Sequence, residues 1–196
     1  MPIMLCDAGT QPGIDLAQPA SWQLADLYAN WLPRPIEIHL LGLNQRWPLA
    51  GLFPQVERRE ITLGQWRLYV GACLQGQILN GGVEQFVFNC PGLVCDAKLL
   101  TSAVGPDELG KQYEEATRGT LEVLDSFASA DPWAEGEALD PLWAAYEQIE
   151  LSEDDIYYLD AMFMWEQVPV PKHGEQLAAS LVKMCLEHPE DFVSSN

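Results

Sequence analysis

Two glycines separate two apolar segments in the stretch Leu79-Asn80-Gly81-Gly82-Val83-Glu84-Gln85-Phe86-Val87-Phe88-Asn89. Upstream of it, apolar residues recur at the three- and four-residue spacing of a helix, which predicts a helix from Thr62 to about Leu79. Glycine adopts positive φ at no steric cost, so the two glycines should end that helix. We expect a second, short helix from Val83 to Asn89.

Helical spacing recurs on both sides of this turn. Toward the N-terminus, Ser21 has the character of an N-cap and Pro33 of a stop, which predicts one short helix between them. Toward the C-terminus, proline and capping signals at Pro106, Asp140-Pro141 and Ser152 mark further helix starts. The pattern predicts helices over 93–104, 107–127, 140–149, 152–167 and 174–187.

The N-terminal part follows no such pattern. The first 20 residues contain Gly9, Pro12, Gly13 and Pro19 and are expected to form an irregular arm. Residues 34–60 are expected to be irregular, with a short strand over 36–40, where apolar residues alternate, as the alternative. We therefore predict an all-α fold, a single compact multi-helix domain. Residues 1–60 would be an N-terminal arm and irregular region packed on the core, and residues 61–196 the helical domain.

Composition places the chain among globular proteins of a reducing compartment. It has 196 residues, 48% of them hydrophobic, and five cysteines at irregular spacing. The N-terminus lacks the features of a secretory signal, and no apolar run approaches the roughly 18 residues of a membrane span. We expect a cytoplasmic protein that does not bind membranes. Cys90 and Cys95 have no second pair to complete a zinc site, so we expect no metal and no cofactor.

Negative charge is concentrated in the second half of the chain. The formal net charge is −19, yet residues 1–98 hold eight acidic and six basic residues, against 21 acidic and four basic in residues 99–196. Adaptation to high salt should act on both halves alike. A field of this sign repels phosphates, so direct binding of nucleic acid or anionic membrane is not expected. The expected partner is basic.

The clearest acidic segment contains no base between Arg118 and Lys172. Its thirteen acids are Glu122, Asp125, Asp131, Glu135, Glu137, Asp140, Glu147, Glu150, Glu153, Asp154, Asp155, Asp160 and Glu166. Some suit helix N-termini, but unpaired carboxylates repel one another unless a partner supplies bases. The stripe of charge that precedes this segment is different, because Lys111 and Arg118 lie at i,i+4 distance from acids of the same helix and predict a self-paired surface.

No catalytic constellation is evident. The histidines, His39, His173 and His188, are scattered, and no nucleophile stands at a recognisable spacing from a base. Asn80-Gly81-Gly82 lacks the order of a phosphate-binding loop and has no basic residue after it. The sequence therefore does not predict an enzyme.

The stretch from Leu79 to Asn89 resembles the Asn-Gly-Gly, Gln-Phe, Asn signature of a bacterial domain family of unknown function that includes a DNA-mimic protein. Val104-Gly105 before an acidic helix, Asp160 among aromatic residues, and the segment 185–192 extend the resemblance over roughly residues 60–193. The resemblance implies an all-helical fold, dimerisation and, for the DNA-mimic member, binding to a helix-turn-helix transcription factor in place of DNA. The matched residues have the character of turn glycines and buried aromatic residues, so they imply fold more directly than function.

The leading hypothesis is an acidic, DNA-mimicking regulator of transcription that occupies the DNA-binding face of a basic protein. Duplex DNA carries about one charge per 1.7 Å and a helix with regularly spaced carboxylates about one per 5 Å, so two or three neighbouring helices, or a homodimer, would be needed. The alternative is an interaction or immunity protein that neutralises a basic partner without imitating DNA. The residues expected to contact the partner are Asp131, Glu135, Glu137, Asp140, Glu147, Glu150, Glu153, Asp154 and Asp155.

Overall fold

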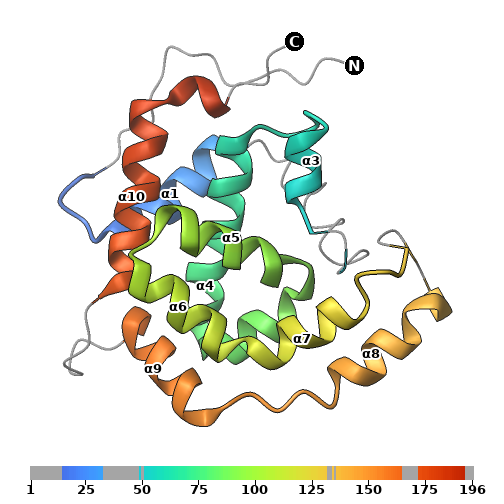
Figure 1. Ribbon diagram of the computed structural model, residues 1–196. Coiled ribbons are helices and arrows are strands. Elements are labelled where there is room, and N and C mark those ends of the chain that lie inside the picture. The colour runs from blue at the N-terminus through green and yellow to red at the C-terminus, as the bar shows by residue number, and fades with distance from the viewer. Residues whose placement is uncertain are drawn as a thin grey trace.

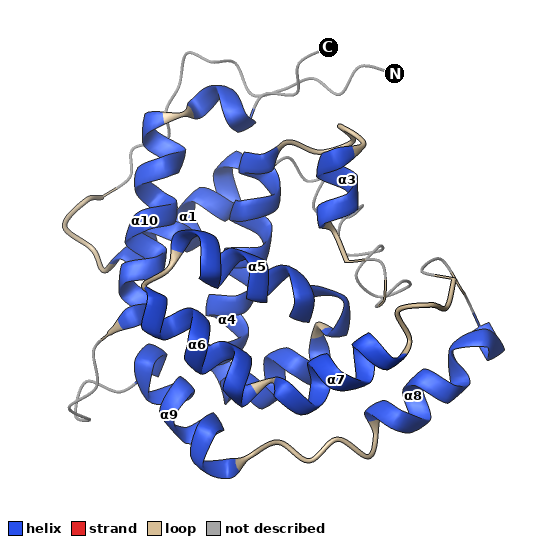
Figure 2. Ribbon diagram, in the orientation of Figure 1, coloured by secondary structure: helices blue, strands red, loops and turns tan. Residues whose placement is uncertain are grey.

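The computed structural model describes residues 15–32, 49, 51–131, 134, 136–164 and 172–192, and every regular element within these ranges is a helix (Figure 2). The prediction of an all-α fold is confirmed for this part of the chain. The α-helices are α1 (Ala20–Trp31), α3 (Phe53–Glu57), α4 (Leu63–Asn89), α5 (Val94–Val104), α6 (Asp107–Ala116), α7 (Arg118–Ser126), α8 (Asp140–Tyr146), α9 (Glu153–Met164) and α10 (His173–Glu187). Short 3-10 turns are η1 (Pro91–Leu93), η2 (Gly136–Leu139) and η3 (Pro189–Phe192).

Helix α4 is the centre of the packing and contacts α1, α5, α9 and α10 (Figure 1). Its start is fixed by a capping box, in which Thr62 Oγ1 accepts from the Gln65 N–H and Gln65 Oε1 accepts from the Thr62 N–H. Leu68, Leu74 and Ile78 along it are fully buried. Helix α1 lies against both α4 and α10, so residues of the N-terminal region contribute to the same core.

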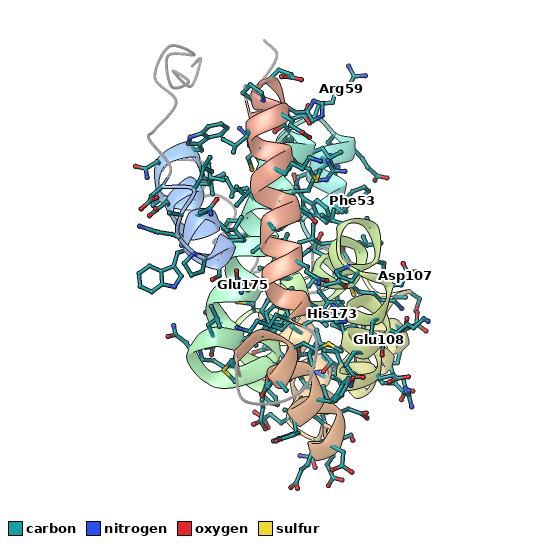
Figure 3. All side chains as sticks on the ribbon, turned by 90° about the vertical axis from the view of Figure 1, so that its left-hand side faces the viewer. Phe53, Arg59, Asp107, Glu108, His173 and Glu175 are labelled. Atoms are coloured by element: carbon teal, nitrogen blue, oxygen red, sulfur yellow. The ribbon has the colours of Figure 1, made fainter. Side chains whose placement is uncertain are left out.

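The contact between α1 and α10 includes a polar link. The Ser21 N–H donates to Glu175 Oε2 on α10 at 3.3 Å, and Leu24 and Leu27 of α1 are buried below it. Glu175 is labelled on α10 in Figure 3. Ser21 lies inside the first turn of α1 rather than at its N-cap, because the helix begins at Ala20 after Pro19.

Helix α4 reverses direction at Gly81 and Gly82. Gly82 has φ +84° and ψ 176°, a conformation that only glycine adopts readily. Gln77 Oε1 accepts from Gln85 Nε2 at 2.8 Å and from Asn89 Nδ2 at 3.0 Å. In a straight helix, residues twelve apart would be about 18 Å from each other. The two predicted helices, with a sharp turn at the glycines, are therefore confirmed, and the side chain of Gln77 ties them together.

Asp160 on α9 closes this turn. Its Oδ1 accepts from the Val83 N–H at 2.7 Å, so it caps the second half of α4. A Cβ built on Gly82 would lie 2.6 Å from Asp160 Oδ2, so the backbone of the glycine and this carboxylate are in close contact. Burial raises the pKa of Asp160, while the hydrogen bond from Val83 acts to lower it.

Two sequence predictions are wrong. Residues 53–57, expected to be irregular, form α3, because Pro54 lies in the first turn of this helix, where its missing N–H costs nothing. The single helix expected from Asp107 to Phe127 is interrupted at Thr117, which has φ −104° and ψ 10°. The buried Thr117 hydroxyl donates to the Tyr113 carbonyl at 2.7 Å, a local bond that competes with regular helix. The alternative strand over 36–40 lies outside the described residues.

The other predicted helices are present with shifted ends. Helix α8 begins at Asp140, after Leu139 as N-cap, and ends at Tyr146 rather than at residue 149. Helix α6 begins at Asp107, with Pro106 as its N-cap. Helix α9 begins after Ser152, whose Oγ accepts from the Asp155 N–H at 3.4 Å.

Asp96 is a second structural carboxylate, only 1% exposed at the start of α5. Its Oδ2 accepts from the Leu52 N–H at 2.7 Å, and its Oδ1 accepts from the Phe53 N–H at 2.9 Å and from Trp66 Nε1 at 2.7 Å. It thereby joins the start of α3 to α4. Burial raises the pKa of Asp96 to about 6, against the three hydrogen bonds, which lower it.

We expect Gly82→Ala to lower the free energy of unfolding by at least about 1–3 kcal/mol, because alanine is strained at this φ and its Cβ meets Asp160. Gly76→Ala is the matched control in the same helix. A Cβ at residue 76 has nothing within 4 Å, so this substitution should stabilise the protein by about 0.5–1 kcal/mol. Urea denaturation of both variants measures the difference, and equal effects would contradict the assigned turn.

We expect Asp96→Asn to lower the free energy of unfolding by about 1–3 kcal/mol at pH 7, since the amide NH₂ would face an N–H donor. The folded-state pKa of Asp96 lies above its ordinary value of 3.8, so the carboxyl contributes most to stability below about pH 4 and less as pH rises through 6. The difference between wild type and variant should therefore narrow between about pH 4 and pH 6. Asp125→Asn, an exposed acid on α7, should show no such trend in the same denaturation series.

Candidate partner-binding surface

We use the name acidic edge for residues 136–155, which comprise η2, α8, the following loop and the first turn of α9. In Figure 1 this segment runs along the lower border of the molecule, from α8 to the start of α9. Helix α8 is held to the core by buried Leu142 and Tyr146, and the Tyr146 hydroxyl donates to the Val87 carbonyl of α4 at 3.0 Å. The segment is therefore an attached part of the domain.

Most of the acids predicted to contact a partner are at the surface. Asp155 is half-buried, and Glu135 lies outside the described residues. The exposed acids are Asp131, Glu137, Asp140, Glu147, Glu150, Glu153 and Asp154. All of these except Asp131 belong to the acidic edge, so the backbone of these six acids lies along one border of the domain (Figure 1).

Bases do not neutralise the acidic edge within the described ranges. The pairs found there are Lys98 Nζ with Glu114 Oε1 at 2.8 Å, Lys183 with Glu187 at 3.8 Å, and His188 with Glu190. None of them involves an acid of residues 136–155. The carboxylates of this segment therefore have no ion-pair partner among the described residues, and such charges repel one another.

Local structure explains some of these acids but not all. Asp140 lies in the first turn of α8, and Glu153, Asp154 and Asp155 lie in the first turn of α9, where the helix dipole favours negative charge. Glu147 follows the last residue of α8, where the dipole disfavours it, and Glu150 lies in the loop. Glu147 and Glu150 are thus the acids with the least structural reason to be present.

The predicted self-paired stripe on α6 and α7 is wrong. Within the described ranges, neither Lys111 nor Arg118 makes an ion pair, and Glu114 pairs instead with Lys98 on α5. The break at Thr117 separates Glu114 on α6 from Arg118 on α7, whereas Lys111 lies on the same helix as Asp107 and Glu115 and, among the described residues, pairs with neither. Figure 3 shows Asp107 and Glu108, from the start of α6, on the flank of the molecule away from α1.

Aromatic side chains that the sequence analysis did not use lie at the acidic edge. The Phe88 and Tyr146 rings meet edge to face with centroids 6.0 Å apart, and Tyr146 meets Trp143 at 5.9 Å. Phe88 is 45% exposed, and Trp143 is half-buried. The position of Phe88, two residues after buried Phe86, was a signal that it faces outward. Its contact with α8 was not visible in the sequence.

A cavity of about 660 Å³ lies beside α5 and α7. Its lining includes apolar Leu121 and Phe127, together with Cys95, Lys98 and Arg118. Cys95 is exposed by surface area, yet partial desolvation of its thiol raises the pKa, the charges of Asp96 and Asp125 raise it further, and Lys98 acts to lower it. In the described part of the chain, no group of His, Cys, Asp and Glu is placed to hold a metal ion.

The domain is thus an acidic all-α domain with an exposed, uncompensated carboxylate edge. No family model matches the chain, and neither the curated proteins nor the solved structures contain a match. No helix of the described residues is long and apolar enough to cross a membrane.

We expect the double variant Glu147→Gln, Glu150→Gln to raise the free energy of unfolding by about 0.3–1 kcal/mol at low ionic strength, because it removes repulsion and an unfavourable charge at the end of α8. The gain should shrink at high salt, where these charges are screened. Glu114→Gln, which breaks the pair with Lys98, should not stabilise the protein. Urea denaturation at low and high salt compares the free energies of unfolding of the wild type and the variants. A double variant that is less stable than wild type would contradict repulsion among these carboxylates.

Proposed function

We propose that this protein is an acidic DNA mimic, which occupies the DNA-binding face of a basic DNA-binding protein such as a transcription factor. The observation that carries the proposal is the acidic edge, a row of exposed carboxylates that no base of the described residues neutralises. Such a surface loses repulsion when a partner supplies cations. The proposed contacts are Glu137, Asp140, Glu147, Glu150, Glu153 and Asp154, together with Asp131, Glu135 and Asp155.

The arrangement of the edge supports imitation of a phosphate backbone. Duplex DNA offers about one charge per 1.7 Å, which one helix with a carboxylate in each turn cannot reach alone. Here the acids come from η2, α8, a loop and α9 rather than from one helix. These elements follow one another along one border, so the row of acids is longer than a single helix, and a second copy of the protein would supply a neighbouring row (Figure 1).

The resemblance to the DNA-mimic family gives a second, weaker support. Its signature residues have structural roles in this chain. Gly82 supplies the positive φ of the turn, Gln85 and Asn89 bind Gln77, and Asp160 caps the turn. The signature therefore bears on the fold, and the functional argument depends on the acids.

The test uses the full-length protein as bait in a lysate at low salt. We expect it to capture a DNA-binding protein, which duplex DNA releases because both compete for one site. Higher salt should also weaken the capture steeply, since exposed charges are screened. Capture of a protein that does not bind DNA, or capture that DNA leaves unchanged, would contradict the proposal and favour a basic partner of another kind.

Matched charge variants locate the contact. Glu137→Gln, Glu147→Gln and Glu150→Gln together should weaken binding of the captured protein at least tenfold. Glu57→Gln, Glu60→Gln and Glu115→Gln change the net charge equally at exposed positions on other elements, and should weaken binding much less. Equal losses in titrations of both triple variants would show that total charge, and not the acidic edge, determines binding.

A further inference from the structure

Imitation of DNA phosphates requires carboxylates, but it does not require the aromatic side chains that lie at the acidic edge. Phe88, Tyr146 and Trp143 form a continuous edge-to-face chain across α4 and α8. Tyr146 is 4% exposed and bonded to Val87, so it fixes the two outer rings in place. Phe88 is 45% exposed, although a ring of this size is normally buried.

Exposed acidic residues lie three or four positions along the chain from each of the two outer rings, Phe88 and Trp143. Asp140 lies three residues before Trp143 on α8, and Glu147, the C-cap of α8, lies four residues after it. Glu84 lies four residues before Phe88 on α4. Side chains at these spacings are neighbours on a helix surface, with Cβ atoms about 5–6 Å apart. Within the described ranges, none of the three acids is ion-paired.

We propose that this aromatic and acidic patch binds arginine side chains of the basic partner and selects them over lysine. A guanidinium is planar and weakly hydrated, so it can stack on a ring while donating two hydrogen bonds to a carboxylate. An ammonium is compact and strongly hydrated, and it gains mainly from the charge. The charge of the patch accounts for a basic occupant, and the exposed Phe88 ring with the half-buried Trp143 ring accounts for the choice of arginine.

This inference rests on the proposed function and adds the selectivity that charge alone does not supply. Long-range attraction acts on every basic protein, whereas binding energy concentrates in aromatic and arginine contacts at the centre of an interface. DNA-binding proteins present both arginine and lysine to phosphates. The patch would favour DNA-binding proteins that present an arginine to the Phe88 and Trp143 rings.

The test compares two fluorescent peptides of equal length and charge, one with six arginines and one with six lysines, by anisotropy titration of the full-length protein at low salt. Wild type should bind the arginine peptide at least two- to fivefold more tightly, the range expected for an exposed cation–π contact. Phe88→Leu keeps an apolar side chain but removes the ring, and should lower this ratio by about twofold or more. Equal affinity of wild type for both peptides, or an unchanged ratio in Phe88→Leu, would overturn the inference.

Two control variants distinguish the effect of the aromatic ring from the effects of charge and of position on the surface. Leu99→Ala removes an exposed apolar side chain on α5 and should leave both affinities unchanged. Glu150→Gln should weaken both peptides by similar factors, because it removes charge from the loop of the acidic edge and keeps the rings and the carboxylates beside them. If the ratio of the two peptide affinities is unchanged in Phe88→Leu while DNA still displaces the natural partner, arginine selection is refuted and DNA mimicry is not. If the ratio falls as expected but DNA does not affect capture of the natural partner, DNA mimicry is refuted and the arginine site remains.

Discussion

The reversal of α4 at Gly82 is the constraint on which the rest of the domain depends. The backbone conformation of Gly82 suits only glycine. The Asp160 carboxylate accepts a hydrogen bond from the Val83 N–H that follows it. Because the chain folds back there, one continuous segment supplies two sides of the core. The first half of α4 packs with α1 and α10, and the second half carries Val87, which accepts the hydrogen bond from Tyr146 of α8. The position of the acidic edge therefore follows from a turn that contains no acid.

The sequence predicted what depends on local spacing. Apolar periodicity and the Gly81-Gly82 break were sufficient for α4, and proline and serine signals placed the starts of α8 and α9 within one residue. The break at Thr117 was missed, because a threonine hydroxyl that bonds to the preceding turn leaves no trace in hydrophobic spacing. Helix α3 was missed because residues 34–60 show no helical spacing, and a proline such as Pro54 can begin a helix as well as break one.

The acids show most clearly what a sequence cannot distinguish. Asp160 belongs to the base-free segment by charge count, yet it is buried and caps a helix contributed by residues far away in the chain. Asp96 has a comparable role, joining Leu52, Phe53 and Trp66. Burial and distant hydrogen-bond donors decide these roles, and neither is encoded in local pattern. The exposed acids, by contrast, were predicted from the absence of nearby bases.

Charge and aromatic surface meet on the same helix, and this bears on how an acidic protein can be selective. A carboxylate edge attracts every basic surface, and salt weakens all such attractions together. The rings of Phe88 and Trp143 are held by Tyr146, so little conformational entropy is lost when a flat cation stacks on them. Because the hydrogen bond from Tyr146 to Val87 also attaches α8 to the reversed half of α4, the same contact orders the fold and fixes the geometry of the patch. Selectivity in this molecule would then come from the rigid aromatic part, and the rate and strength of capture from the surrounding charge.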